Sequence, residues 1–283
     1  MSNPDNLKLS IVIPTLGREK ELRTLLESIK SNIRNVNYEV IIVDQNFSSL
    51  LDDIVKYFSE FYTIKHRKVN FRGLSRAKNY GLEESSGETI IFMDDDAEIL
   101  PESIELALNF LDYNPEIDAI CGRMVDRDYN DSVKKFCKEK GLLSINSFED
   151  KFIESSMMFR TLSLDNYRFD EKLGCGTFHG AEEGYDLIYR LLLQGKKIWF
   201  DPNIIYYHPQ TISTKTSDAE IRRVFSYRCG YAALCKKHSF KRKYYSRLIK
   251  VFCSIPFLLL FKRKHLRYYT AELLGLLSGK VID

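Results

Sequence analysis

With 283 residues, of which 44% are hydrophobic and 13% aromatic, the chain can bury a core, and this composition excludes an intrinsically disordered protein. Its formal net charge of +3 hides an asymmetry, because residues 236–269 hold 11 Lys or Arg and no Asp or Glu, whereas the rest of the chain holds 31 basic and 39 acidic residues. The basic segment is the kind that meets an anionic surface, either a membrane or a nucleic acid.

The first half of the chain alternates strand and helix patterns. Short apolar runs rich in β-branched residues predict strands, and apolar residues at helical spacing predict the helices between them. Strand–helix–strand repeats form parallel sheets covered by helices, so the predicted fold class is α/β. The expected strands are residues 9–13, 38–43, 63–66, 89–93 and 119–121, and the expected helices are residues 22–33, 51–58, 73–86 and a stretch after Pro101.

The second half is less regular at first and becomes helical. Residues 122–180 show weak periodicity and predict loops. The only linker pattern lies near residues 213–217, so we expect one domain over residues 1–215 and a basic helical extension over residues 216–283. The expected elements are a helix over residues 183–194, strands over residues 197–200 and 204–207, and helices from residue 217 onward.

Three consecutive carboxylates, Asp94, Asp95 and Asp96, follow the strand predicted at residues 89–93. They repel one another unless water or a cation neutralises them. Hard oxygen ligands suit Mg²⁺ or Mn²⁺, and such a metal can clamp a diphosphate leaving group. Asp44 also follows a predicted strand, so it should meet the acidic run at the carboxyl edge of the sheet. A solvated acidic turn is the alternative interpretation of the run.

Two common nucleotide-binding patterns are absent. The first strand is followed by no G-x-G-x-x-G, which argues against a dinucleotide-binding oxidoreductase. The chain also has no G-x-x-x-x-G-K-[ST], which argues against a phosphate-loop NTPase.

Six segments in this order resemble the family-2 inverting glycosyltransferases, which have the GT-A fold. The resemblance covers roughly residues 9–210, and no single segment is specific by itself. The segments are LSIVIPTLGR (9–18), EVIIVDQ (39–45), GLSRAKNYG (73–81), IIFMDDDA (90–97), GAEEGYDL (180–187) with Arg190, and YYHP (206–209).

The resemblance implies a role for each matched residue. Asp96 would bind Mn²⁺ or Mg²⁺, and His208 would add a contact to the metal or the diphosphate. One carboxylate of the Glu182–Glu183 pair, by preference Glu183, would be the general base. The nucleotide-binding residues would be Pro14, Thr15, Arg18, Asp44, Arg76, Asp94 and Asp95, with Thr15 and Asp44 on the base and ribose.

The matched residues also have structural interpretations. Arg76 could be a solvated helix residue, and His208 could be a turn histidine before Pro209. Glu182 and Glu183 could be glutamates favoured by a helix N-terminus. Two departures from the family pattern stand out, because Asp186 lies three residues after Glu183 instead of two, and Phe47 intrudes after the second strand.

The function implied is a metal-dependent inverting transfer of a hexose or N-acetylhexosamine. The donor would be a nucleotide-sugar, by resemblance a UDP-sugar, and the acceptor a hydroxyl of a glycan or lipid-linked molecule in surface polysaccharide or glycoconjugate assembly. Residues 1–122 would bind the nucleotide and residues 123–215 the acceptor. The alternatives are a non-catalytic membrane-surface binding protein with the same fold and a sugar-nucleotide nucleotidyltransferase, whose opening glycine-rich loop is missing here.

The basic segment, residues 236–269, holds two cationic clusters around the apolar run 251–261. The run is too short to cross a bilayer but can lie in the headgroup region, which favours an anionic membrane over nucleic acid. Packing of the run on the rest of the protein is the alternative. Six cysteines without a C-x-x-C pair, and a polar start, predict reduced thiols in the cytoplasm, with the protein peripheral on the inner face of the cell membrane.

Overall fold

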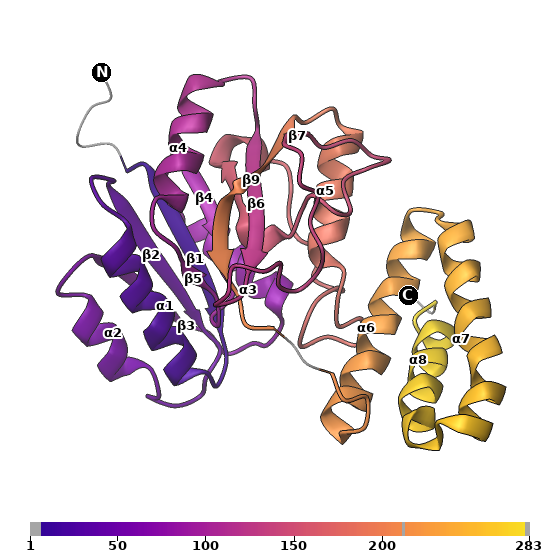
Figure 1. Cartoon of the computed structure of the whole chain (residues 1–283). Coiled ribbons are helices and arrows are strands. Elements are labelled where there is room, and N and C mark those ends of the chain that lie inside the picture. The colour runs from indigo at the N-terminus through magenta and orange to yellow at the C-terminus, as the bar shows by residue number, and fades with distance from the viewer. Residues whose placement is uncertain (1–6, 211–212, 281–283) are drawn as a thin grey trace. The chain divides into compact units, whose positions relative to one another are not determined.

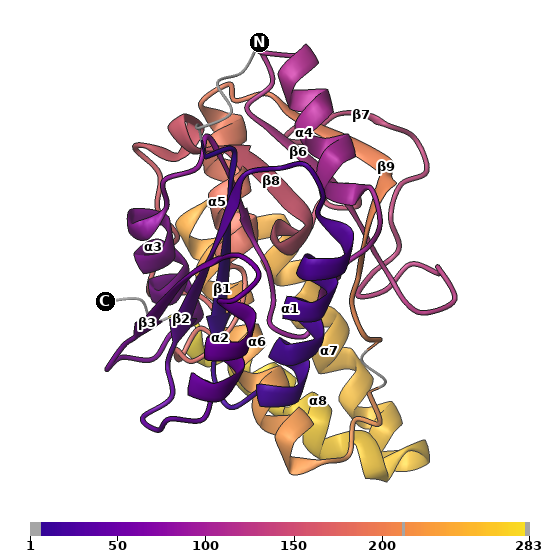
Figure 2. The same cartoon turned by 90° about the vertical axis from the view of Figure 1, so that its left-hand side faces the viewer.

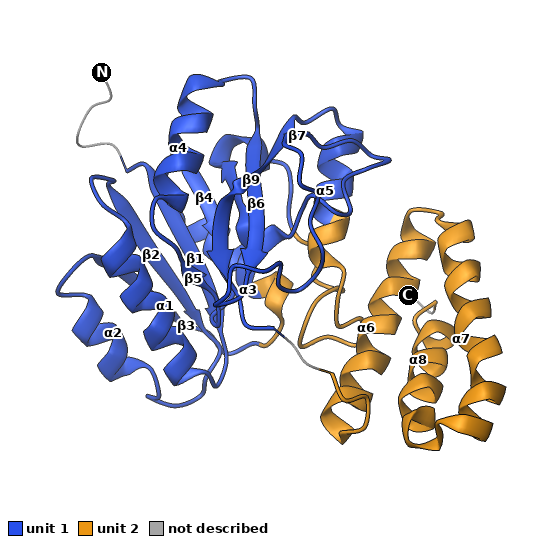
Figure 3. Ribbon diagram, in the orientation of Figure 1, with its two compact units in different colours: residues 1–71, 77–168, 187–211 blue, residues 72–76, 169–186, 212–283 orange. Residues whose placement is uncertain are grey.

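The computed structural model describes residues 7–210 and 213–280 (Figure 1). The chain divides into two compact units, which Figure 3 colours separately. The first unit comprises residues 1–71, 77–168 and 187–211, and the second comprises residues 72–76, 169–186 and 212–283. The division into domains at residue 215 stays a prediction.

A mixed sheet forms the first unit, and within the described residues it has nine strands in the order β3-β2-β1-β4-β8-β6-β9-β5, with β7 on β9. Strands β3, β2, β1 and β4 are parallel, and β8 is antiparallel to both β4 and β6. The α/β class is therefore confirmed. The strands are β1 Leu9–Thr15, β2 Tyr38–Asp44, β3 Thr63–Lys68, β4 Thr89–Phe92, β5 Glu98–Ile99, β6 Ala119–Val125, β7 Gly141–Leu142, β8 Met157–Arg160 and β9 Ile198–Tyr207.

Helices cover both faces of the parallel strands, and Figure 2 shows α1 and α3 on opposite sides of β1. The inner face of α1 repeats apolar residues at helical spacing, and Leu22, Leu25 and Ile29 are fully buried. With both faces covered, β1 reads as a continuous apolar run. The helices are α1 Glu19–Asn32, α2 Asp52–Phe58, α3 Leu74–Glu84, α4 Ser103–Tyr113 and α5 Glu183–Leu193, with short 3-10 turns at Glu154–Ser156 and Thr161–Leu164.

Two strands differ from the sequence prediction. Strand β1 continues through Pro14, which pairs in register with Val43 of β2. The pairing of β1 with β4 stops at Val12, so the N–H that proline lacks on that side removes no hydrogen bond of the sheet. The two strands expected at residues 197–200 and 204–207 form one strand, β9, whose register against β6 shifts between Cys121 and Arg123. This register shift is a β-bulge, which lets the strand continue through the residues where the sequence predicted a break.

The second unit is a helical bundle of α6 Asp218–Lys237, α7 Lys241–Phe261, a 3-10 turn Arg263–His265 and α8 Leu266–Ser278. Ser217 and Glu220 form a capping box that starts α6. Helices α6 and α8 touch closely, since a Cβ at Gly275 would come 2.4 Å from the Phe225 carbonyl oxygen. The basic helical extension expected from the sequence is confirmed.

Part of the basic segment is structural. The Glu272 carboxylate is 1% exposed and accepts hydrogen bonds from Arg228 Nε at 2.7 Å and Arg247 Nε at 2.9 Å. These contacts join α6, α7 and α8 through one buried acid. Arg247, one of the cations counted in residues 236–269, therefore holds the bundle together through a buried partner.

Candidate active site

Parallel strands bring polar residues to one edge of the first unit. Thr15 ends β1 and Asp44 ends β2, and the two are partners in the strand register. The acidic run follows β4, whose end is tied to β1 by the bond from Met93 N to Val12 O. Thr15 Oγ1 donates to Asp95 Oδ2 at 2.8 Å, so the ends of β1 and β4 are linked through side chains as well.

Arg18 joins this edge from the loop after β1. Its Nη1 atom lies 2.9 Å from Asp95 Oδ1 and 2.5 Å from Asp96 Oδ2. Burial raises the pKa of Asp95 to about 6, and the neighbouring carboxylates add to this shift, whereas Thr15 and Arg18 oppose it. Arg18 therefore compensates part of the negative charge of the acidic run, at Asp95 and Asp96.

Asp44 is fully buried and both of its carboxylate oxygens are engaged. Oδ1 accepts from the backbone N and the Nδ2 of Asn46 at 2.9 and 2.7 Å, and Oδ2 lies 2.9 Å from His66 Nε2. Burial alone would raise the pKa of Asp44, but the bonds from His66 and Asn46 hold it below its ordinary value. The carboxylate is therefore charged and fixed in orientation.

His208 follows β9 and faces the acidic run. Its Nε2 atom lies 3.5 Å from Asp96 Oδ1 and 4.0 Å from Asp94 Oδ2. Its Nδ1 atom lies 2.8 Å from the Pro209 carbonyl oxygen. A carbonyl oxygen only accepts, so Nδ1 carries the proton, and in the neutral ring the lone pair of Nε2 points at the two carboxylates. This is the tautomer of a metal-ligating histidine whose other nitrogen is held by a backbone carbonyl.

The donor set of Asp94, Asp96 and His208 fits a divalent cation in its chemistry. Two carboxylates and an imidazole suit Mn²⁺, and Mg²⁺ or Mn²⁺ commonly completes its shell with water and substrate phosphates. In the part of the chain that the structure describes, no three His, Cys, Asp or Glu groups could hold a metal ion as they stand. The oxygen of Asp96 that faces His208 is Oδ1, whereas Arg18 contacts Oδ2, so one oxygen remains directed at the histidine.

Lys78 and Glu154 form a buried ion pair beneath the acidic run. Lys78 Nζ lies 2.8 Å from Glu154 Oε1, and the lysine side chain is 1% exposed. Burial raises the pKa of Asp94, the positive charge of Lys78 acts in the opposite direction, and Glu154 and Asp96 raise the pKa further. Lys78 therefore helps to keep Asp94 ionised.

The two glutamates of which one is the predicted general base, Glu182 and Glu183, lie in the second unit at the start of α5. Glu182 adopts a left-handed conformation with φ of 76°, and its carbonyl accepts from Asp186 N at 2.9 Å. Glu183 is 7% exposed. Gly174, with φ of 100°, lies against it, because a Cβ at this position would come 3.2 Å from the Glu183 carboxyl and 2.8 Å from Ser75 Oγ. The Glu183 side chain is thus packed against the backbone of Gly174, where a residue with a Cβ would be strained and crowded.

Asp186, the residue at which the spacing departs from the family pattern, is fully buried and paired with residues at the end of α6. Its Oδ1 atom lies 2.8 Å from Lys237 Nζ and 2.8 Å from His238 Nε2. This aspartate joins α5 to the end of α6. Arg76 lies in the first turn of α3, in the same unit, and its side chain is exposed.

The structure thus gathers most of the predicted nucleotide and metal residues at one edge of the first unit. Arg76, Glu182 and Glu183 belong to the second unit. Four residues of these surroundings were not predicted from the sequence, namely His66, Lys78, Glu154 and Gly174. Only Lys78 carried a signal, because it lies inside the matched segment 73–81. The gathered residues are Pro14, Thr15, Arg18, Asp44, Asp94, Asp95, Asp96 and His208.

Comparison with known proteins identifies the family. Residues 10–180 match the profile of glycosyl transferase family 2. The chain belongs to this family. It is 25% identical over 207 residues, 71% of the chain, to the poly(ribitol-phosphate) β-N-acetylglucosaminyltransferase TarP of Staphylococcus aureus. It spans 62% of the length of TarP, and between 15% and 37% of the length of seven other curated relatives.

Solved structures share the fold at low identity. TarS 1–349 of S. aureus in complex with UDP-GlcNAc is similar with a TM-score of 0.61 and 20% identity, over 80% of this chain and 66% of that chain. The mannosyltransferase PcManGT of Pyrobaculum calidifontis, in complex with GDP-Man and Mn²⁺, is similar with a TM-score of 0.63 and 13% identity, over 98% and 88% of the two chains. These likenesses establish the GT-A type fold.

Proposed function

We propose that this protein is a metal-dependent inverting glycosyltransferase. It moves a hexose or N-acetylhexosamine from a nucleotide-sugar, of the UDP class, to a hydroxyl of a glycan or lipid-linked acceptor. Membership of glycosyl transferase family 2 supports the reaction class. The TarS complex with UDP-GlcNAc supports a UDP-sugar donor, and the PcManGT complex with GDP-Man and Mn²⁺ supports a nucleoside-diphosphate donor bound with a metal. A role in surface polysaccharide or glycoconjugate assembly is supported by the similarity to TarP, which is named as a transferase acting on poly(ribitol-phosphate).

The observation that carries the proposal is the meeting of Asp94 and Asp96 with the Nε2 lone pair of His208. These three side chains would hold Mn²⁺ or Mg²⁺. When bound, such an ion neutralises the charge that develops on the diphosphate leaving group. Thr15 and Asp44 would orient the base and ribose.

Glu183 would take the proton from the acceptor hydroxyl. The acceptor oxygen then forms a bond to the anomeric carbon as the bond from that carbon to the diphosphate oxygen breaks, so the configuration inverts. A positioned general base typically contributes about 10²–10⁴-fold to the rate. The burial of Glu183 against Gly174 suits this role, because it fixes the carboxylate in one orientation.

The test is the release of UDP from a panel of UDP-sugars, with and without Mn²⁺. We expect release with at least one donor, its loss in EDTA, and its loss in Asp96→Ala at an unchanged melting temperature. Lys20→Ala, an exposed change in the same unit, is the control and should keep wild-type release. Equal release in EDTA would contradict metal dependence. No release from any nucleotide-sugar would favour the non-catalytic binding protein.

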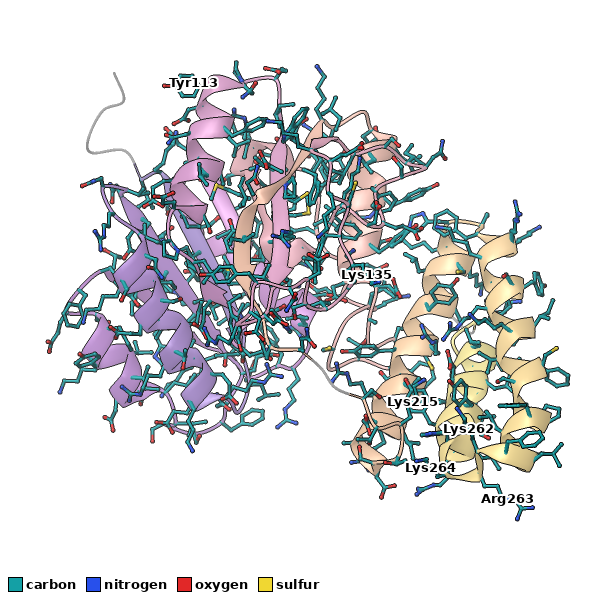
Figure 4. All side chains as sticks on the ribbon, in the orientation of Figure 1. Tyr113, Lys135, Lys215, Lys262, Arg263 and Lys264 are labelled. Atoms are coloured by element: carbon teal, nitrogen blue, oxygen red, sulfur yellow. The ribbon has the colours of Figure 1, made fainter. Side chains whose placement is uncertain are left out.

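We also propose that the α7 region docks on the cytoplasmic face of an anionic membrane. Large apolar side chains of α7 face solvent, including Phe252 at 65%, Leu260 at 73% and Phe261 at 70% exposure. Exposed cationic clusters, residues 241–243 and 262–264, stand at its two ends. Figure 4 labels Lys262, Arg263 and Lys264 together at one end of the bundle. Each cation near an anionic surface contributes about 1 kcal/mol.

From the sequence, the apolar run 251–261 was predicted to be too short to cross a bilayer. Helix α7 has 21 residues and is long and apolar enough to cross by length and composition, with 17% of its most apolar window buried. The helix is longer than the apolar run because it starts at Lys241. The cations and Tyr residues of its first turns favour the surface position.

Co-sedimentation with vesicles of rising phosphatidylserine content tests the docking. Binding should rise with anionic lipid, weaken with salt, and fall when Lys262, Arg263 and Lys264 are all changed to Glu. The matched control changes three exposed lysines of the first unit, Lys20, Lys56 and Lys140, to Glu and should bind as the wild type does. Equal recovery in the supernatant at every composition rules docking out. Resistance to alkaline extraction from cell membranes would indicate a span instead.

A further inference from the structure

The second unit contains a cavity of about 450 Å³ that the proposed reaction does not use. It lies between the loop that contains Asp170 and Lys172 and the last turns of α6, and every residue that lines it belongs to this unit. Three lysines, one aspartate and one histidine line it, together with the apolar residues Leu173 and Ala233. A volume of this size lies in the range of small-molecule sites, about 300–1,000 Å³.

His179 is the unusual group in the wall. It is 8% exposed, and its Nε2 atom is buried and has no hydrogen-bond partner within the described residues. Its backbone is fixed, because its carbonyl accepts from Gly174 N and Ala181 N, both at 2.8 Å. A buried polar atom without a partner is rare, since leaving it so costs about 1–3 kcal/mol. The His179 side chain also lines the cavity, so a ligand there that turns the ring would supply the missing partner.

The charges around the cavity favour an anion. Lys237 is paired with Asp170 at 2.6 Å and Asp186 at 2.8 Å. Lys236 Nζ donates to the Lys280 carbonyl at 2.9 Å, which is a neutral acceptor. Three lysines and one aspartate line the cavity, so the formal charge of the lining is positive.

We propose that this cavity binds a phosphate ester of a small polyol or sugar. The tetrahedral oxyanion would take hydrogen bonds from Lys172 and Lys236 and from the His179 ring. Lysines act as point charges for phosphate from several directions, a geometry less suited to a planar carboxylate. Leu173 and Ala233 give the carbon part of the ligand an apolar wall, and the cavity exceeds the size of inorganic phosphate.

Such an ester can reach the cavity from two sources. It can be a free metabolite that regulates the protein, or it can be a phosphoryl group of the acceptor itself. The second source rests on the proposed function, whereas the binding site does not.

Titration calorimetry with sn-glycerol 3-phosphate, in EDTA and without donor, tests the site alone. We expect saturable binding to the wild type and none of glycerol or acetate. The double variant Lys172→Gln/Lys236→Gln should bind at least about tenfold more weakly. The matched control Lys20→Gln/Lys56→Gln, exposed in the first unit, should bind as the wild type does. Absence of saturable binding to the wild type, or equal loss in the control, overturns the proposal.

His179→Leu gives a second test that does not depend on charge. Because Nε2 has no partner, the variant should melt at the wild-type temperature or above it without ligand. It should lose the stabilisation that glycerol 3-phosphate gives the wild type. A ligand-induced shift equal to that of the wild type would contradict the role of His179.

The source is distinguished by adding UDP-GlcNAc and Mn²⁺ and searching for glycosylated glycerol phosphate by mass spectrometry. A product that disappears in Lys172→Gln/Lys236→Gln assigns the cavity to the acceptor. Binding without product assigns it to a free phosphate ester. Failure of the calorimetry leaves UDP release from the donor intact, so the two proposals fail separately.

Discussion

The carboxylates at the acidic edge of the first unit and the carboxylate of Glu183 in the second unit are held in place by different means. Asp94, Asp95 and Asp96 follow a buried strand, and side chains from neighbouring strands and loops hold them. Glu183 is held by a left-handed residue before it and by Gly174 against it. The first arrangement depends on side chains that can exchange partners, whereas the second depends on backbone conformation. The side chains of the acidic edge can therefore change contacts if the proposed metal and donor bind, while Glu183 stays in one orientation.

The largest effect should come from Glu183→Gln. The change keeps the shape and removes the proton acceptor, so transfer should fall by about 10²–10⁴-fold with donor affinity unchanged. Single-turnover transfer and UDP binding, measured on the same preparation, check this. Glu182→Gln is the control and should stay within about tenfold of the wild type. If Glu182→Gln is inactive and Glu183→Gln active, the assignment within the pair is reversed.

A smaller effect is expected from Gly174→Ala, which tests whether backbone conformation fixes the base. The Cβ would approach the Glu183 carboxyl and Ser75 Oγ, and φ of 100° is unfavourable for alanine. We expect kcat to fall about tenfold, the loss typical of a small misplacement of a base, with KM for the donor unchanged. Gly195→Ala is a matched control, with φ of 75° and open space around its Cβ. It should lower stability by about 1 kcal/mol and leave kcat unchanged. An equal loss of kcat in both variants would mean that strain alone is responsible.

The smallest effect concerns Asp44 and pH. Its pKa is lower in the folded protein than the unfolded value of about 3.9, so its carboxylate stabilises the fold above that pH and loses this contribution as pH falls through the folded pKa. Asp44→Asn should be less stable than the wild type by about 1 kcal/mol near neutral pH. The difference should shrink below about pH 4, as chemical denaturation at several pH values would show. A difference independent of pH would mean that the carboxylate charge does not contribute.

The sequence predicted the acidic edge better than the Glu183 loop for a physical reason. Strands leave a clear apolar pattern, and Asp44 and Asp94 stand directly after two of them, so their convergence follows from parallel pairing. His66 was missed because β3 is a half-exposed edge strand with a weak pattern. Gly174 was missed because a left-handed glycine in a loop leaves no periodic signal.

The helical bundle shows the same limit. Its basic composition indicated a surface-binding segment, yet Arg247 is directed at the buried Glu272. Composition counts charges without saying which of them have internal partners. The cavity around His179 was equally invisible, because its walls come from a loop and from the far end of α6.

The proposed reaction requires that the edge formed by Asp94, Asp96 and His208 binds a divalent cation together with a nucleoside diphosphate. Electron paramagnetic resonance of free Mn²⁺ tests it most directly, because the signal of the hexaaqua ion falls when Mn²⁺ is bound. We predict that wild-type protein with UDP removes one equivalent of free Mn²⁺, and that Asp96→Asn with UDP removes no more than UDP alone. If the free Mn²⁺ signal is the same with wild-type protein and UDP as with UDP alone, this edge does not bind the metal and the proposed role of Asp94, Asp96 and His208 is wrong.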